Sequence, residues 1–206
     1  EKLFFGWPEI SVYALNRLCC PKKTFEQIFS EKSKVKLLIE NKIDYTKNLY
    51  ENIEIKKKGF ELKNINDKIS LSILKNHEEN KHPEILFCCY GGVVNEVIDA
   101  AYNLMIEQEI SSSIFIPTKI SPIDDTLIEE IKKINFKKII IVEDGYASCG
   151  WGSHLVTSLI KNKLNFKLSD VEIYGPKNHM IPANFYKEKE FFPNSKSIYK
   201  DILNLL

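Results

Sequence analysis

Lys138 to Leu155 reads KIIIVEDGYASCGWGSHL and determines the architecture that we expect for this chain. Ile139 to Val142 form a continuous apolar, β-branched run, the pattern of a strand that is buried on both faces. The run stops at Glu143 and Asp144, and Gly150 to Gly152 then opens an apolar helical segment. A buried strand followed by a loop and a helix is the unit of an α/β domain, in which ligands and partners gather at the carboxyl ends of strands.

The same alternation of strand and helix extends from residue 84 to residue 206. We expect strands over residues 85–90, 114–116, 139–142 and 171–174, and helices over residues 93–107, 121–134, 152–161 and 195–206. Units of about 25 residues predict right-handed crossovers between parallel strands. The expected fold class is therefore α/β, with a mostly parallel, doubly wound sheet.

The first 46 residues look like part of another α/β unit. A strand is expected over residues 10–15, and Thr24 with Gln27 suggests a capping box for a helix that ends near Lys32. Val35 to Ile39 reads as a strand buried on both faces. We therefore expect a partial α/β remnant at 1–46, a linker with local structure at 47–83, and a complete domain at 84–206.

Composition favours a globular protein with an ordinary surface. Hydrophobic residues make up 44% of the 206 residues, charged residues 28%, and the formal net charge is +1. Arg17 is the single arginine among 29 basic residues, which disfavours nucleic-acid readout. No apolar run approaches the length of a membrane span. Five cysteines without a disulfide pattern suggest the cytoplasm or an organelle matrix. The sequence starts at Glu1 rather than Met, so we expect it to be part of a longer polypeptide.

No set of residues suggests a self-contained catalytic or metal site. Gly91-Gly92 follows a strand and could receive a phosphate, but a tight turn with positive φ or a close backbone approach is the simpler interpretation. Glu143 and Asp144 are adjacent, point to opposite faces of a strand, and by default cap the next turn. Cys149 precedes a helix and is either a reactive thiol or an apolar filler. We expect no catalytic residue and no metal ligand.

Four residues around this corner are candidates for an interface. Trp151 lies between two glycines and is expected to be exposed enough to meet another chain, with packing inside the domain and ligand contact as alternatives. His154 follows near the helix start, where it faces a partner or packs internally. Asp144 and Tyr146, in the loop after the strand, complete the set.

The order of these segments resembles the C-terminal part of the transketolase-like enzymes that use thiamine diphosphate. The nearest likeness is to the beta subunit of the decarboxylating component of 2-oxo acid dehydrogenases. The motifs that carry it are Ile85-Leu86-Phe87 with Tyr90-Gly91, Val94-Asn95-Glu96 with Ala100-Ala101, Ile120-Ser121-Pro122 with Asp124, Val142-Glu143-Asp144-Gly145-Tyr146 with Gly150-Trp151-Gly152, Tyr174-Gly175-Pro176 with Ile181-Pro182-Ala183, and Glu40-Asn41-Lys42 with Tyr45. Each motif is short, but together they cover nearly the whole chain, least surely residues 51–80.

The resemblance implies a function for the intact enzyme. It would decarboxylate a 2-oxo acid (pyruvate or branched-chain) through thiamine diphosphate with Mg²⁺. The activating glutamate and the active-site histidine would belong to a pyrimidine-binding domain whose tail is residues 1–46, so the fragment alone would be inactive and bind no cofactor tightly. Residues 84–206 would be the transketolase C-terminal-like domain, which serves subunit assembly. Its partners would be the alpha subunit, a second beta subunit and the acyltransferase core.

Two other interpretations stay open. The chain could be the C-terminal domain of another transketolase-like enzyme, of the acetoin dehydrogenase, transketolase or deoxyxylulose phosphate synthase type. The synthase is less favoured, because a sugar phosphate would be expected to require more arginine. A non-enzymatic interaction module is the second possibility. A flavodoxin-like nucleotide-binding regulator is disfavoured by the missing phosphate loop.

Overall fold

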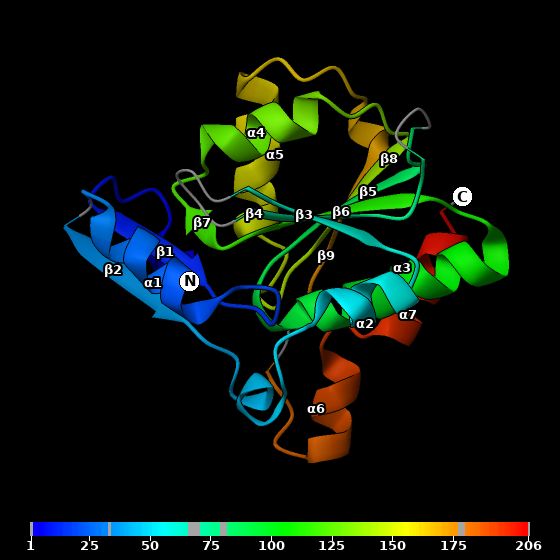
Figure 1. Cartoon of the computed structure of the whole chain (residues 1–206), viewed down its shortest axis with the longest axis horizontal. Coiled ribbons are helices and arrows are strands. Elements are labelled where there is room, and N and C mark those ends of the chain that lie inside the picture. Colours follow the sequence, from blue (N-terminus) through cyan, green and yellow to red (C-terminus); the bar gives the residue numbers. More distant parts are fainter. Residues whose placement is uncertain (1, 33, 66–70, 79–81, 177–179, 206) are drawn as a thin grey trace.

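The computed structural model describes residues 2–32, 34–65, 71–78, 82–176 and 180–205. Within them the strands form a six-stranded sheet in the order β3-β4-β6-β5-β8-β9 and a three-stranded sheet in the order β2-β1-β7 (Figure 1). The strands are β1 (Ile10–Ala14), β2 (Val35–Ile39), β3 (Glu61–Ile65), β4 (Leu71–Lys75), β5 (Ile85–Cys89), β6 (Ser112–Pro117), β7 (Lys119–Ser121), β8 (Lys138–Val142) and β9 (Val171–Tyr174).

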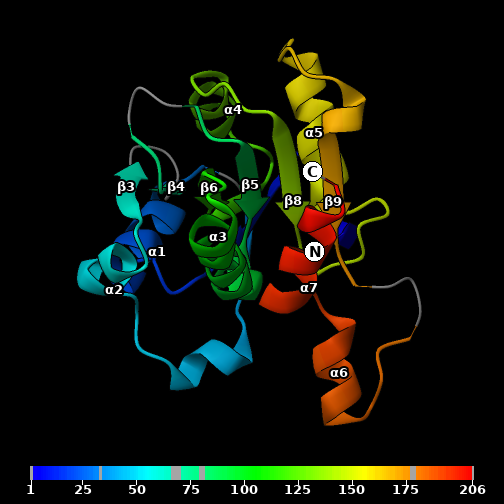
Figure 2. The same cartoon turned by 90° about the vertical axis from the view of Figure 1, so that its right-hand side faces the viewer.

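Helices cover both faces of the large sheet. The α-helices are α1 (Pro21–Ser30), α2 (Asn52–Lys57), α3 (Val94–Gln108), α4 (Asp125–Lys132), α5 (Trp151–Lys161), α6 (Phe185–Phe191) and α7 (Ser195–Leu203), and short 3-10 turns are η1 (Lys2–Phe4), η2 (Lys42–Thr46), η3 (Gly91–Val93) and η4 (Leu168–Asp170). One hydrophobic cluster joins α2, α3 and α7 to the sheet, and a second joins α4 and α5 to its other face. Figure 2 shows this layering from the side.

The predicted fold class is confirmed. β5 pairs in parallel with β6 and β8, and β8 pairs in parallel with β9. All five residues of β5 are buried, as their continuous apolar run predicts. Because the carboxyl ends of β5, β8 and β9 meet at one edge, the loops that follow them lie together.

The stretch at 47–83 is more than the linker that its charged residues suggested. It contains α2, and β3 and β4 extend the large sheet, with β4 antiparallel to β6. β4 is buried in all but its last residue. β3 is an edge strand whose Glu61 and Lys63 are exposed, and charged side chains on an edge discourage pairing with other chains. Because of these charges, the sequence pattern does not predict the pair of strands β3 and β4.

The small sheet contains the expected strand–helix–strand unit, with β1 parallel to β2. Its third strand, β7, comes from the large body and pairs antiparallel to β1. β2 is an edge strand with Val35 exposed, so the prediction of burial on both faces was wrong. The predicted capping box was also wrong. Helix α1 begins at Pro21, which suits a first helical position, and Thr24 is buried inside the helix.

One apolar core joins the two sheets. Val12 and Ala14 of β1 belong to the same cluster as Tyr90, Ile120 and Trp151 of the large body. The N-terminal residues therefore have no core of their own, and they pack on the large body through β1.

Candidate functional site

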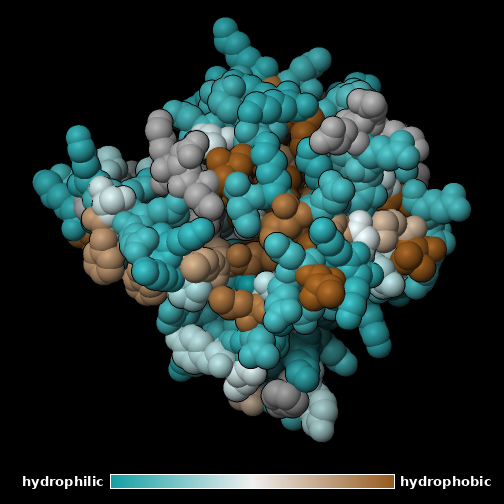
Figure 3. All heavy atoms as spheres, in the orientation of Figure 1, coloured by the Kyte–Doolittle hydropathy of each residue, from teal (hydrophilic) through white to brown (hydrophobic). Residues whose placement is uncertain are grey.

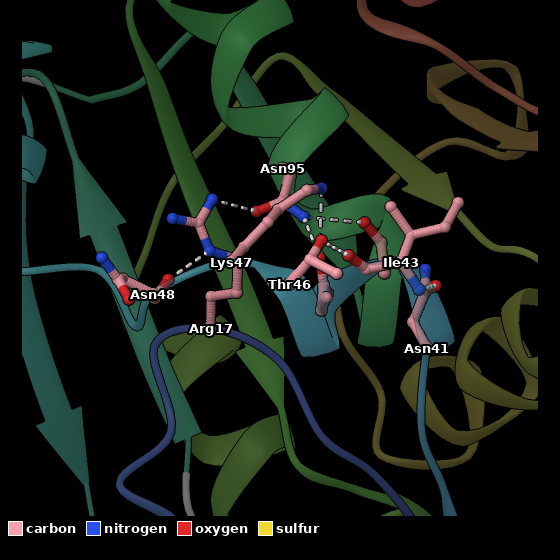
Figure 4. Close-up of polar contacts among 9 residues, drawn as sticks. Arg17, Asn41, Ile43, Thr46, Lys47, Asn48 and Asn95 are labelled. Carbon is pink, nitrogen blue, oxygen red and sulfur yellow. Dashed lines mark hydrogen bonds and ion pairs between the residues drawn. The ribbon is translucent and has the colours of Figure 1, made fainter.

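The two sheets meet at the carboxyl ends of β1, β2 and β5, where polar side chains gather (Figure 4). We call this the junction cluster, formed by Arg17, Asn41, Asp44, Gly92 and Asn95. Arg17 follows β1, Asn41 and Asp44 follow β2, and Gly92 and Asn95 open α3. Strand ends of this kind are where α/β proteins position functional groups.

Arg17 is held by the chain itself. Its Nε donates to the backbone oxygen of Asn48 at 2.7 Å, and its Nη1 donates to Asn95 Oδ1 at 3.4 Å. The guanidinium carbon lies 4.0 Å from the centre of the Tyr50 ring, a cation–π contact. Burial raises the pKa of Tyr50, while the positive charge of Arg17 opposes that rise. The single arginine therefore fixes the segment after η2 against α3.

Asn95 and Asp44 connect the small sheet to α3. Asn95 Nδ2 donates to Asp44 Oδ1 at 3.1 Å and to the Gly92 oxygen at 3.3 Å. Lys47 Nζ lies 3.2 Å from the same Asp44 oxygen. Asp44 Oδ2 is buried and has no hydrogen-bond partner within the described ranges. The cluster thus leaves one carboxylate oxygen that could accept a further hydrogen bond.

Gly91 and Gly92 form the tight turn with positive φ and close packing that the sequence predicts. Gly91 has a φ of +60°, which favours glycine. A Cβ on Gly92 would lie 1.6 Å from Asn41 Nδ2. The Asn41 amide therefore occupies the space beside Gly92, which is the close approach that the sequence predicts for this turn.

The side chain of Glu143 caps the start of α5, the second helix start that contains glycines. Its side chain is fully buried, and it accepts hydrogen bonds from the backbone nitrogens of Trp151 at 2.8 Å and Gly152 at 3.3 Å. A Cβ on Gly150 would lie 2.3 Å from Glu143 Oε2. The predicted capping role is confirmed for Glu143, whose negative charge also suits the positive end of α5.

Trp151 is not exposed, and that part of the prediction was wrong. Its side chain is 0% exposed and meets the Tyr90 ring edge-on, with centroids 5.1 Å apart. Trp151, Leu155 and Leu159 recur at helical spacing on one buried face of α5. This spacing could have identified Trp151 as a core residue from the sequence. Packing inside the domain is therefore the alternative that the structure favours, since a buried indole cannot directly contact another chain.

His154 lies on α5 against the N-terminal segment of the same chain. Its ring is 5.9 Å from that of Phe5, at an angle of 43°. Burial, with a smaller contribution from Lys161, lowers the pKa of His154. The half-buried ring is thus in contact with the chain itself, and an interface role for it remains a proposal.

Asp144 and Tyr146 are brought together at a cavity of about 290 Å³ beside the carboxyl ends of β8 and β9. We call it the edge cavity, and its lining is Leu3, Asp144, Gly145, Tyr146, Pro176, Ile181, Phe191 and Phe192. A Cβ on Gly175 would lie 2.5 Å from the Gly145 oxygen, so glycine lets the two loops touch. The lining is mostly apolar and contains one carboxylate, that of Asp144.

Other chemistry finds little support. No group of three or more His, Cys, Asp or Glu side chains gathers at metal-binding distances in the described part of the chain. Burial raises the pKa of the Cys88 and Cys89 thiols. Cys149 is exposed, and the helix start that follows it is already capped by Glu143. His179 lies outside the described residues. Among the helices described, none combines the length and apolar character of a membrane span.

Comparisons with known proteins place the chain in a family. The sequence profile of the family described as "Transketolase, C-terminal domain" matches residues 75–198. The chain is 27% identical over 110 residues to the pyruvate dehydrogenase E1 component subunit beta of Rickettsia felis, covering 53% of this chain and 33% of that protein. It is 30% identical over 138 residues to the 1-deoxy-D-xylulose-5-phosphate synthase of Cytophaga hutchinsonii, covering 66% of this chain and 21% of that protein.

Solved structures show the same fold. A split-gene transketolase, described as an inactive beta4 tetramer, superposes with a TM-score of 0.62 at 12% identity, covering 100% of this chain and 60% of that one. A mutant transketolase of Pichia stipitis gives a TM-score of 0.58 at 14% identity, covering 97% of this chain and 25% of that one. The chain thus spans about a third or less of the length of the two curated relatives.

Proposed function

Because the chain belongs to the family of transketolase C-terminal domains, we propose that it is the C-terminal part of a thiamine-diphosphate-dependent enzyme. The proposed type is the beta subunit of a 2-oxo acid dehydrogenase, acting on pyruvate or a branched-chain 2-oxo acid. The observation that carries the proposal is the family match over residues 75–198, which spans the elements from the end of β4 to the start of α7. The motifs quoted above, including those at the ends of β2, β5, β8 and β9, support it.

Arginine use favours the dehydrogenase type over the alternatives. A transketolase or deoxyxylulose phosphate synthase acts on sugar phosphates, for which arginine is the preferred partner. The only arginine of this chain, Arg17, is engaged with Asn48, Asn95 and Tyr50. The C-terminal domain of such an enzyme, or of an acetoin dehydrogenase, remains the second candidate, since the synthase of Cytophaga hutchinsonii is also a relative.

We propose that the cofactor site of the intact enzyme is not formed by this chain alone. Of the two glycine-bearing helix starts, one has the Asn41 amide packed against Gly92 and the other is capped by the Glu143 carboxylate. The described residues also hold no cluster of side chains suited to Mg²⁺. Thiamine diphosphate and Mg²⁺ would therefore require groups from elsewhere in the intact enzyme. No catalytic step is assigned to residues of this chain.

We assign to the chain a role in subunit assembly. Of the 17 large hydrophobic side chains that are exposed among the described residues, ten lie in the first 53 residues. Such a concentration of apolar surface is typical of a region that contacts other polypeptide. The edge cavity, with Asp144 and Tyr146 in its wall, is the second proposed contact. The proposed partners are the alpha subunit, a second beta subunit and the acyltransferase core.

We also propose a division of the chain, which β1 and β2 of the small sheet support. Residues 1–46 are assigned to the tail of the pyrimidine-binding domain, and the C-terminal domain is extended toward the N-terminus to include β3 and β4. The described cysteines are all free, which fits the proposed location in the cytoplasm or an organelle matrix.

The experiment is to purify the native assembly that contains this polypeptide, through an affinity tag at its C-terminus, and to assay it with thiamine diphosphate and Mg²⁺. Three assays separate the types: oxidation of pyruvate or branched-chain 2-oxo acids with ferricyanide, ketol transfer between sugar phosphates, and condensation of pyruvate with glyceraldehyde 3-phosphate. We expect activity in the first. Activity only in the second or third would select the other enzymes, and a pure protein that is inactive in all three would refute the proposal.

A further inference from the structure

Helix α1 exposes an aromatic ridge on the side that faces away from the small sheet. Thr24 and Ile28 face the protein and are buried. Phe25 and Phe29, four residues apart, stack with centroids 6.2 Å apart and an interplanar angle of 25°. Phe29 is 75% exposed and Phe25 is 37% exposed. Figure 3 shows apolar side chains interrupting the hydrophilic surface around α1, at the left of the molecule.

The positive charges beside this ridge are unfavourably placed relative to the dipole of α1. Lys22 and Lys23 lie in the first turn, where the positive end of the helix dipole disfavours cations. That turn contains no acidic residue, and its N-cap, Cys20, makes no side-chain capping bond. Both lysines are exposed, and neither has a hydrogen bond or ion pair in the described structure. The chain itself therefore provides no compensation for their position.

The nearby carboxylates do not neutralise the surface. Glu31, directly after α1, accepts from Lys119 Nζ with both oxygens, at 2.9 and 2.8 Å. Lys32 follows and is exposed. Glu26 is the one exposed carboxylate on the helix itself. The outer face of α1 is thus apolar in its centre and basic at both ends.

We propose that this outer face docks an acidic, amphipathic segment of a partner polypeptide. Its apolar side chains would cover Phe25 and Phe29, and its carboxylates would lie beside Lys22 and Lys23. Cations at a helix start are unfavourable for the helix, and features that break local rules in this way are expected at functional sites. This contact is separate from the edge cavity, and it rests on the assembly role proposed above, because Phe25 and Phe29 are among the exposed side chains counted there.

A protein partner fits this face better than a nucleic acid or a lipid surface. Readout of nucleic acid favours arginine, and the single arginine lies in the junction cluster. Binding to an anionic membrane needs a larger basic and apolar face than a ten-residue helix with two exposed phenylalanines provides. A pair of aromatic side chains at helical spacing instead matches helix-in-groove recognition.

The test uses a designed helical peptide of 18 residues, with leucines along one face and glutamates beside them. A second peptide carries lysines in place of the glutamates. Each is titrated into the ¹⁵N-labelled chain, and amide shifts and affinity are measured by NMR. The variants are Phe29→Ala and the double variant Lys22→Glu/Lys23→Glu. Ile106→Ala is the matched control, because Ile106 is also exposed, at 61%, but lies on α3.

We expect the acidic peptide to shift amides of residues 21–31, and the lysine peptide to leave them in place. Phe29→Ala should weaken binding about tenfold, the loss typical of an interface anchor. The lysine double variant should weaken binding by a comparable factor. In 0.5 M salt, the difference in affinity between this variant and the unaltered chain should become smaller. Ile106→Ala should bind normally. Shifts that map elsewhere, equal binding of both peptides, or stronger binding of single-stranded DNA or phosphatidylserine vesicles at α1 would overturn the proposal.

Discussion

The side-chain amide of Asn41 occupies the space that a Cβ on Gly92 would fill, with Nδ2 1.6 Å from that position. Asn41 follows β2 of the small sheet, and Gly92 lies in η3, the turn that precedes α3. Because of this contact, the junction requires glycine at position 92. Substitutions of Gly92 and Asn41 can be combined to test the contact.

We predict that Gly92→Ala destabilises the chain by about 1–3 kcal/mol, because the methyl group and the Asn41 amide cannot share one position. Asn41→Ala in the same chain should recover part of that loss, since it removes the clash. Urea unfolding of the two single variants and the double variant gives the coupling energy. Strictly additive effects would show that the two groups do not touch.

We predict that Glu143→Gln destabilises the chain by about 1–3 kcal/mol. The glutamine amide can accept at only one of its two ends, so its NH₂ group would face a backbone N–H of Trp151 or Gly152 that Glu143 now satisfies. Urea unfolding at pH 7 provides the measurement. Glu129→Gln is the control, because the ion pair of Glu129 with Lys132 is exposed and its loss should change stability by less than about 0.5 kcal/mol. Equal effects of the two variants would contradict the capping role.

We predict that Arg17→Lys lowers stability by about 1 kcal/mol although the charge is kept. Lysine cannot lie flat on the Tyr50 ring and donate to Asn48 at the same time, as the guanidinium does. Thermal unfolding should show the loss. Lys137→Gln, which removes an exposed pair with Glu84, is the comparison and should have little effect.

The same contact predicts a shift in the titration of Tyr50. Burial raises the pKa of Tyr50 and the charge of Arg17 counteracts part of that rise. Replacing Arg17 by leucine removes the counteracting charge, so the pKa of Tyr50 should move further up. The Cζ resonance of Tyr50, followed by NMR from pH 8 upward, reports the change. A downward movement would mean that the ring becomes exposed in the variant.

Acidification should weaken the contact between α5 and the N-terminal segment. Burial lowers the pKa of His154 below its ordinary value of 6.5. The unfolded chain then binds a proton more readily than the folded one, so the stability from a neutral His154 is present above pH 6.5 and is lost as the pH falls below it. Unfolding curves at pH 7.5 and 5.5 should show a smaller acid loss for His154→Gln than for the unaltered chain. An identical acid loss in both proteins would exclude His154 as the source.

The sequence predicts those strands and helices whose pattern depends on neighbouring residues, and it misses those that depend on packing against distant segments. Val171 to Tyr174 was predicted with its observed bounds, and α5 and β8 to within one residue. For β8 the reason is its continuous apolar run, which is typical of a buried strand. Segment 47–83 failed, since its lysines mark an edge strand and a turn while the strand pair depends on distant β6. Composition alone does not distinguish such an edge from a linker.

For the site residues too, the sequence predicts the contacts between near neighbours and misses those between distant segments. The role of Glu143 could be inferred because its partners lie nearby in the sequence. The junction cluster could not, because Arg17 and Asn95 are 78 residues apart and only the docking of the two sheets brings them together. The glycines that flank Trp151 suggest exposure in the sequence, but in the structure Gly150 and Gly152 make room for Glu143 and Ile173.

Strand β7 belongs to the large body along the chain, but it is hydrogen-bonded to β1. Melting of the small sheet would therefore break the strand pair that joins β1 to the large body, and a nick near residue 48 should leave two pieces that stay together. A gene fission, fusion or domain-swap junction placed between residues 46 and 84 would separate strands that need each other to fold.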